Sequence, residues 1–167
     1  RVASAMSLYY STYRYLADEM KSWPPLYSAY KLYDEGMKSF GHGDYQEAFD
    51  NFNEAQKKDP QFITPIVMKA AAMANLDKIQ QANALFENLR KKGNQLNPLA
   101  QAYVDFALAS NNGDVLGSYR YARQLVDLES SHRTLINAGL RALWLNRPNE
   151  ALDIFQKTDP ELRMTPL

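Results

Sequence analysis

Few side chains in this sequence stand at spacings that would suit acid–base or metal chemistry. The candidates are His42, His132 and the acidic pairs Asp18–Glu19 and Asp159–Glu161. A metal site usually needs more histidines than these two, and no histidine or carboxylate cluster has the spacing of metal ligands. Turn and helix-end positions explain the acidic pairs better than acid–base catalysis does. We therefore expect no catalytic residues, no metal site and no cofactor, and we interpret the protein as a non-enzyme.

The sequence also lacks the motifs of nucleophilic and nucleotide chemistry. It contains no cysteine, which excludes disulfides, thiolate metal ligands and a cysteine nucleophile. No glycine-rich phosphate-binding motif and no G-x-S-x-G motif occurs. Lysine plus arginine equals aspartate plus glutamate at 19 each, so no basic excess attracts nucleic acid. Binding, rather than catalysis, is the function class that remains.

Aromatic side chains are concentrated towards the start of the chain. Eight of the eleven tyrosines precede residue 46, which indicates a functional surface or interface near that end. Hydrophobic residues make up 46% of the 167 residues, which is enough for a real core. No apolar run approaches the ~18–20 residues that a membrane span needs. We expect no membrane contact by this segment.

Residues 29–62 form a unit of 34 positions with small and large residues at fixed places. Small residues stand at positions 8, 20 and 27, and a large one stands at position 24. They are Gly36, Ala48, Ala55 and Phe52. This pattern predicts two closely packed antiparallel helices, separated by a turn at residues 41–44. Asp44 is predicted to be the N-cap of the second helix, and Glu47, three residues later, is predicted to be its reciprocal partner in a capping box.

The same pattern returns three more times along the chain. The small residues at position 20 are Ala48, Ala82, Ser118 and Ala151, at intervals of 34, 36 and 33 residues. In the third copy Phe106 at position 8 and Ala122 at position 24 reverse the usual sizes, which we interpret as a volume-conserving exchange. The spacing predicts roughly 70% helix and no strand. The predicted helical pairs are residues 29–60, 63–93, 99–128 and 132–158.

This helix-turn-helix period resembles the tetratricopeptide repeat (TPR) family. The resemblance implies an all-α fold, a TPR-type helical solenoid of about four repeats with one leading N-terminal helix. The solenoid is expected at residues 24–162, followed by a tail at residues 163–167. Its first helices are expected to leave a concave inner face. The repeats are expected near residues 29–62, 63–96, 99–131 and 132–162.

The leading helix is predicted at residues 1–23 from a stripe of apolar residues spaced alternately three and four apart. The stripe consists of Ala3, Met6, Tyr10, Tyr13, Ala17 and Met20. Trp23-Pro24-Pro25 ends the helix, because proline removes a donor and disfavours helix in the residue before it. We interpret the stripe as a cover for the exposed end of the first repeat. The alternative is a short coiled-coil seam that would make a homodimer.

Short motifs make the resemblance more specific. They are Pro24-Pro25, Ala29-Tyr30, Gly43-Asp44-Tyr45, Asp59-Pro60-Gln61-Phe62, Asn146-Arg147-Pro148, Glu150-Ala151 and Asp159-Pro160-Glu161. Together they are similar to the TPR segments that follow the membrane span of bacterial signalling proteins with a winged-helix transcriptional regulator or Ser/Thr kinase domain. The chain begins at Arg1 rather than Met, which suggests a segment of a larger protein with such a span ahead of it. The resemblance implies an extracytoplasmic (periplasmic) location at the inner membrane. If the resemblance to these signalling proteins does not hold, we expect a cytoplasmic location.

The TPR resemblance places partner contacts at positions 2, 5, 9, 12 and 13 of each first helix. From these positions we predict that the partner-binding residues are Tyr30, Tyr33, Met37, Asn75, Tyr103, Asn111 and Arg133. The fourth repeat adds Ile136, Leu140, Leu143 and Trp144 to the same face. A surface of aromatic, apolar and amide groups suits an apolar or extended peptide segment.

These observations leave two functions from different classes. The first is a non-catalytic protein–protein interaction scaffold, the sensory or partner-binding part of a bacterial signalling receptor. The alternative is a small-molecule-sensing pocket in the same solenoid, which a closed cavity at the aromatic N-terminal end would favour. A purely structural interpretation also stands, in which the same side chains pack against the leading helix or against each other.

Overall fold

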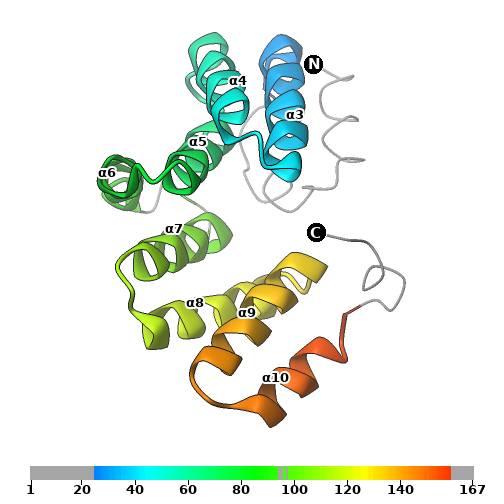
Figure 1. The fold of residues 1–167 in the computed structure, drawn as a ribbon. Helices are drawn as coiled ribbons and strands as arrows, with labels where there is room; N and C mark the ends of the chain where they lie inside the picture. Colours follow the sequence, from blue (N-terminus) through cyan, green and yellow to red (C-terminus); the bar gives the residue numbers. More distant parts are fainter. Residues whose placement is uncertain (1–24, 94–95, 97, 159–167) are drawn as a thin grey trace. The chain divides into compact units, whose positions relative to one another are not determined.

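The structure, a computed structural model, describes residues 25–93, 96 and 98–158 (Figure 1). Helices take up 79% of these residues, and no strand occurs among them. The helices are α3 (Tyr27–His42), α4 (Tyr45–Lys58), α5 (Thr64–Asn75), α6 (Ile79–Arg90), α7 (Pro98–Asn111), α8 (Val115–Leu128), α9 (His132–Trp144) and α10 (Pro148–Phe155). The predicted all-α, TPR-type fold of four helix-turn-helix pairs is confirmed.

Two compact units divide the chain, Arg1–Asn97 and Pro98–Leu167. In the first unit α3 packs against α4, α4 against α5, and α5 against α6. In the second unit the same order holds from α7 to α10. The predicted leading helix at residues 1–23 and the tail at residues 163–167 lie outside the described residues, so the proposed domain limits stay a prediction.

One residue in the left-handed conformation follows the first helix of every pair. These residues are Gly43 (φ 86°), Asp77 (φ 58°), Gly113 (φ 73°) and Asn146 (φ 57°). In each turn the next residue donates its backbone N–H to a carbonyl five residues earlier, as Asp44 does to Ser39 at 2.9 Å. This is the hydrogen bond of a Schellman motif. The left-handed residues recur at intervals of 34, 36 and 33, the same intervals as the small residues at position 20.

Glycine at position 8 lets the two helices of a pair approach closely. A Cβ on Gly36 would lie 2.7 Å from a ring carbon of Phe52, and a Cβ on Gly139 would collide with the ring of Phe155 in the same way. The small residues at position 20 are buried in all four pairs, with exposed fractions of 0–1%. The predicted register of the repeat therefore agrees with the packing.

The third pair departs from this arrangement. Ala122 at position 24 is fully buried, and Phe106 at position 8 is 8% exposed. The Phe106 ring contacts the guanidinium group of Arg141 on α9, with 4.8 Å between the guanidinium carbon and the ring centroid. The predicted exchange of volume with Ala122 stays a prediction. The large residue at position 8 gives α7 an aromatic contact with α9 of the next pair.

The predicted capping box at the start of α4 is wrong. Asp44 is the N-cap residue, but its side chain accepts no capping hydrogen bond. Glu47 instead accepts a hydrogen bond from the Ser39 hydroxyl at 3.1 Å. Asp114 does cap α8, accepting from the Gly117 N–H at 2.8 Å. A Cβ on Gly117 would collide with the Asp114 carboxylate, so that cap depends on a glycine where the first pair has glutamate.

Candidate functional site

Three of the predicted partner contacts lie in the hydrophobic core of the first unit. Tyr30, Tyr33 and Met37 have exposed fractions of 6%, 3% and 4%. The Tyr33 ring centroid is 5.9 Å from that of Phe52 and 5.3 Å from that of Phe62. This placement supports the structural interpretation, in which these side chains pack against each other. Their role as partner contacts stays a prediction, because a partner reaches them only if this core opens.

The other four predicted contacts lie nearer the surface. Asn75 is exposed at the end of α5, where its side-chain amide donates to a backbone carbonyl one turn earlier at 2.9 Å. Tyr103 is half-buried on α7, with 6.4 Å between its ring centroid and that of Phe106. Asn111 and Arg133 are half-buried at the end of α7 and the start of α9. The seven predicted contacts are therefore divided between the two units, and their common role stays a prediction.

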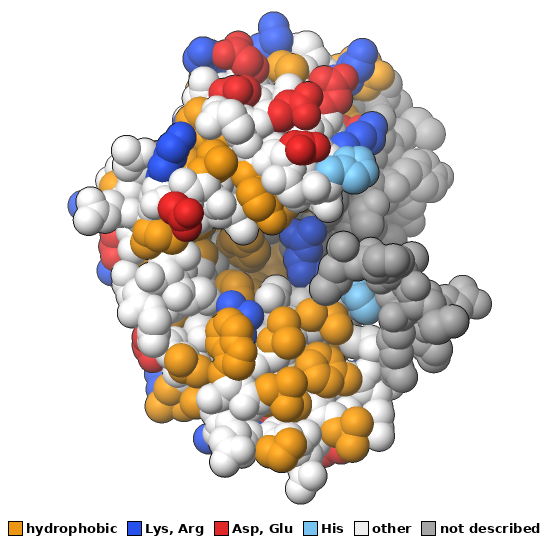
Figure 2. Space-filling model, viewed as in Figure 1, with side chains coloured by type: hydrophobic (Ala, Val, Ile, Leu, Met, Phe, Trp, Pro, Cys, Tyr) orange, Lys and Arg blue, Asp and Glu red, His pale blue; other side chains and the backbone are white. Residues whose placement is uncertain are grey.

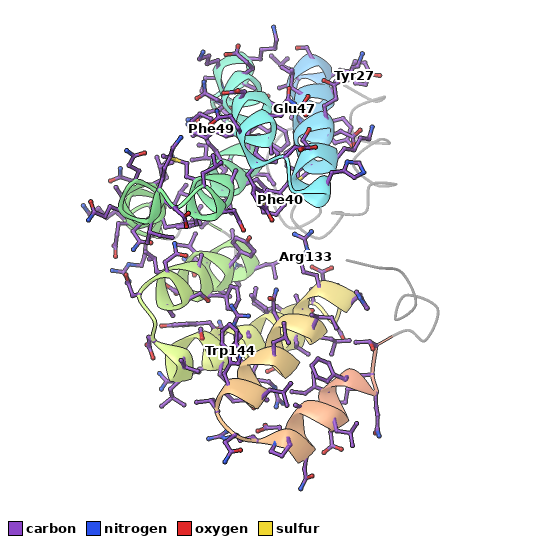
Figure 3. The ribbon with its side chains drawn as sticks, in the orientation of Figure 1. Tyr27, Phe40, Glu47, Phe49, Arg133 and Trp144 are labelled. Carbon is purple, nitrogen blue, oxygen red and sulfur yellow. The ribbon has the colours of Figure 1, made fainter. Side chains whose placement is uncertain are left out.

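Three large apolar side chains on one side of α9 are exposed, and we call them the α9 apolar surface. They are Leu140, Leu143 and Trp144, with exposed fractions of 38%, 45% and 63%. Residues three and four apart lie on the same helix face, so these side chains are neighbours. Figure 2 shows apolar side chains gathered over this part of the second unit, and Figure 3 labels Trp144. A single exposed leucine is ordinary, whereas several large apolar side chains together on one exposed face make that face a candidate interaction surface.

The sequence of α9 explains why these side chains are left outside. The buried stripe of the helix consists of Thr134, Leu135, Ala138, Gly139 and Ala142. Packing of α9 against α8 and α10 uses one side of the helix. The exposed residues belong to a second apolar side, at positions that the sequence assigns to the inner face. Helix α9 is therefore apolar on two sides, of which the second unit covers one.

Arg141 lies beside the α9 apolar surface and contacts two aromatic rings. Its guanidinium carbon is 4.8 Å from the ring centroid of Phe106 on α7 and 4.6 Å from that of Trp144. One Nη donates to the Ser110 hydroxyl at 3.3 Å. The buried Nε has no acceptor among the described residues. Burial lowers the pKa of Arg141, although an arginine still stays charged at neutral pH.

Sequence reasoning misses Arg141, because position 10 is not one of the inner-face positions of the repeat. The signal that could have indicated it is Phe106, a large aromatic residue at a position that is otherwise small. That departure from the repeat pattern provides the ring on which the arginine lies.

A polar cluster joins α8 to α10 in the same unit. Glu150 accepts a hydrogen bond from the Tyr119 hydroxyl and another from Arg123 at 3.0 Å. Its second oxygen is 3.5 Å from Nη1 of Arg147. The hydrogen bond from Tyr119, followed by that from Arg147, holds the pKa of Glu150 below its usual value. Because donors from two helices occupy this carboxylate, we interpret the cluster as a structural brace.

Replacing Glu150 tests this brace. Glu150→Gln should lower the free energy of unfolding at pH 7 by about 1 kcal/mol, because the amide loses the charge-assisted hydrogen bonds. A carboxylate whose pKa is lowered by folding stabilises the protein above its unfolded pKa. That contribution is lost as the pH falls through the lowered folded value. The difference between the two proteins should therefore shrink below about pH 4, as measured by urea denaturation at several pH values.

Glu87→Gln is the matched control for this change. Glu87 pairs with Arg90 three residues later on α6 at 2.8 Å, and both side chains are exposed. Such a pair contributes about 0.2–0.5 kcal/mol. Equal losses in the two variants would contradict the brace.

Two other features, a metal-holding cluster and a membrane-spanning helix, are not found in the described part of the chain. Among residues 25–93, 96 and 98–158, no three histidine, aspartate or glutamate side chains are arranged to hold a metal ion. Within the same ranges, no helix combines the length and apolar character required to cross a membrane.

Comparison with known proteins gives a likeness of fold. No family model and no curated protein matches the sequence. Among solved structures, MamA 41-end from Desulfovibrio magneticus RS-1 is similar, with a TM-score of 0.51 and 18% identity over 77% of this chain and 72% of that chain. The MamA RS-1 ArsTM double mutant gives a TM-score of 0.50 with the same identity and coverage. MamA is a TPR-like helical repeat protein, and at this identity the likeness shows the fold alone.

Proposed function

We propose that this protein is a non-catalytic protein–protein interaction scaffold whose α9 apolar surface binds a segment of a partner protein. The observation that carries the proposal is the exposure of Leu140, Leu143 and Trp144 on one side of α9. Large apolar side chains in water favour association with an apolar partner. The TPR-type fold supports the proposal, since stacked repeats of this kind present extended binding surfaces.

The predicted contacts Tyr103, Asn111 and Arg133 belong to the same proposal. All three lie on α7 or α9, the two helices that Arg141 joins through its contacts with Phe106 and Ser110. Their hydroxyl, amide and guanidinium groups can hydrogen-bond to the backbone of an extended segment. Tryptophan and arginine are also the residues that most often dominate binding energy at an interface.

Loss of Trp144 should weaken partner binding. We expect Trp144→Ala to raise the Kd at least about tenfold, or about 1.4 kcal/mol, because it removes the largest exposed side chain of the surface. The probes are peptides selected from a random phage-displayed library against the wild-type protein, and calorimetric titration measures their binding. Leu152→Ala is the control, since Leu152 is 56% exposed on α10 and lies outside the surface. The proposal fails if no peptide is selected, or if both variants bind as the wild type does.

A small-molecule sensor remains the alternative, but no observation favours it. A hollow of about 600 Å³ lies at the turn between α3 and α4 of the first unit. Its lining consists of Gly43, Asp44, Tyr45, Gln46, Glu47, Asp50 and Leu76. This hollow is open and carries three carboxylates, whereas small-molecule pockets are mostly enclosed and apolar.

The finer proposal is that the scaffold is the sensory or partner-binding part of a bacterial signalling receptor. It rests on the short motifs from Pro24-Pro25 to Asp159-Pro160-Glu161, and the comparisons add no support to it. The full-length reading frame decides it, because such a receptor requires a membrane span and an effector domain ahead of Arg1.

A further inference from the structure

Arg141 carries a positive charge that no carboxylate among the described residues balances. In the described part of the second unit, Glu150 pairs with Arg123 and Arg147, and no described carboxylate lies within ion-pair distance of Arg141. Helix α9 contains no aspartate or glutamate, and α7 contains Asp105 alone. A partly buried charge without a counter-ion is unfavourable, which agrees with the lowering of the Arg141 pKa by burial. A ligand that brings a negative charge would remove this cost.

The hydrogen-bonding capacity of Arg141 is only partly used among the described residues. Phe106 and Trp144 contact the guanidinium group through their rings. A guanidinium group has five N–H donors in one plane, and among the described residues Ser110 accepts from one of them. Because Nε is buried, the fork that could match the two oxygens of a carboxylate is the planar one formed by the two Nη atoms. Of the exposed apolar side chains, Trp144 lies directly beside the guanidinium group, with its ring centroid 4.6 Å from the guanidinium carbon.

Resting on the proposed function, we propose that the partner segment bound at the α9 apolar surface contains an aspartate or glutamate whose carboxylate pairs with Arg141. In this proposal, large apolar side chains of the partner, next to its acidic residue, pack against Leu140, Leu143 and Trp144. The partner is therefore an acidic–apolar peptide segment. Its one negative charge pairs with Arg141, and its neighbouring apolar group packs on the α9 apolar surface.

The distribution of charge argues for one carboxylate rather than a phosphate group or a lipid surface. Phosphorylated segments and anionic membranes are bound by clusters of basic residues. Arg133, the other arginine of α9, is eight residues from Arg141, which is about 12 Å along the helix axis. The two arginines are therefore more than two helical turns apart and are not neighbours on the helix. An isolated arginine between apolar side chains fits an isolated carboxylate.

A double-mutant cycle tests the pairing, using the peptides selected for binding that depends on Trp144. Each of these peptides should contain Asp or Glu beside a large apolar residue. Replacing that residue by Asn or Gln should weaken binding to the wild-type protein about tenfold. The same replacement should change binding to Arg141→Met less than about twofold, because the partner charge is already gone. Circular dichroism and thermal melting establish that Arg141→Met folds.

Two further variants make the result decisive. Arg120→Met removes an exposed arginine from α8 of the same unit, and the tenfold effect of the amide replacement should persist in it. If Arg141→Met does not fold, Arg141→Lys replaces it, since lysine keeps the charge but loses the planar fork and should reduce the effect of the amide replacement.

The outcomes separate this inference from the function on which it rests. Peptides that depend on Trp144 but carry no acidic residue would overturn the inference and leave the scaffold standing. So would an amide replacement that acts equally on the wild type and on Arg141→Met. Absence of any peptide that depends on Trp144 would overturn both. Binding of phosphatidylserine vesicles that Trp144→Ala abolishes, without peptide binding, would show a membrane surface instead and would also overturn both.

Discussion

Phe52→Ala should lower the free energy of unfolding by about 3–5 kcal/mol, the largest effect that we expect from a single side chain. Phe52 is fully buried, and its ring lies against Gly36 and 5.9 Å from the Tyr33 ring centroid. Alanine removes the buried ring and leaves a cavity between α3 and α4 that the rigid helices cannot close. Urea denaturation followed by circular dichroism measures the loss.

Phe49→Ala is the control for this cavity. Phe49 lies on the same helix and is only partly buried at the edge of the same core. Its ring also lies 5.9 Å from the Lys78 amine. The loss should be clearly smaller, because water can fill the space that a partly exposed ring leaves. Equal losses at the two positions would show that Phe52 is not the centre of the first pair.

Gly36→Ala should destabilise the protein by about 2–3 kcal/mol, although alanine is the better helix former by about 1 kcal/mol. The added Cβ would lie 2.7 and 2.8 Å from two ring carbons of Phe52 and 3.2 Å from Cβ of Asn51. The Phe52 ring has no exposed side into which it can move. Helices α3 and α4 must therefore separate, which loosens the whole contact between them.

Gly41→Ala provides the matched control in the same helix. No atom lies within 4 Å of a Cβ added at Gly41. The helix-forming preference of alanine should act there without opposition, so we expect no loss or a gain of up to about 1 kcal/mol. The same urea denaturation measures both variants. Destabilisation of equal size at Gly36 and Gly41 would contradict the close approach of the helices.

The helical pairs could be predicted from the sequence because the features that determine them are local and recur. Gly36, Ala48 and Phe52 show where two helices must touch, and their counterparts return at nearly constant intervals. The second turn is harder to recognise, since its left-handed residue is Asp77 rather than glycine. The capping box at Asp44 and Glu47 fails for a related reason. A polar side chain near a turn has several possible hydrogen-bond partners, and Glu47 accepts a hydrogen bond from the Ser39 hydroxyl across the turn.

The candidate site could be predicted only in part, because exposure depends on what packs against each residue. Tyrosine and methionine serve both as core residues and as contact residues, so their types do not distinguish the two roles. Tyr33 occupies an inner-face position, yet Phe52 and Phe62 surround it. Trp144 follows the same positional rule and is exposed. Arg141 is indicated only indirectly, by the large Phe106 at a position that is otherwise small, since its surroundings come from that residue on another helix.

Within each of the two units, the packing of each helix against the next one has a consequence for folding speed. When neighbouring helices provide the principal contacts, the chain closes only short loops to form them, and the relative contact order is low. Chains of this kind fold within microseconds to milliseconds, and their cooperativity passes from one pair to the next as in a one-dimensional array. A defect in α10 at the end of the second unit therefore reaches α9 first, because α9 is the helix against which α10 packs.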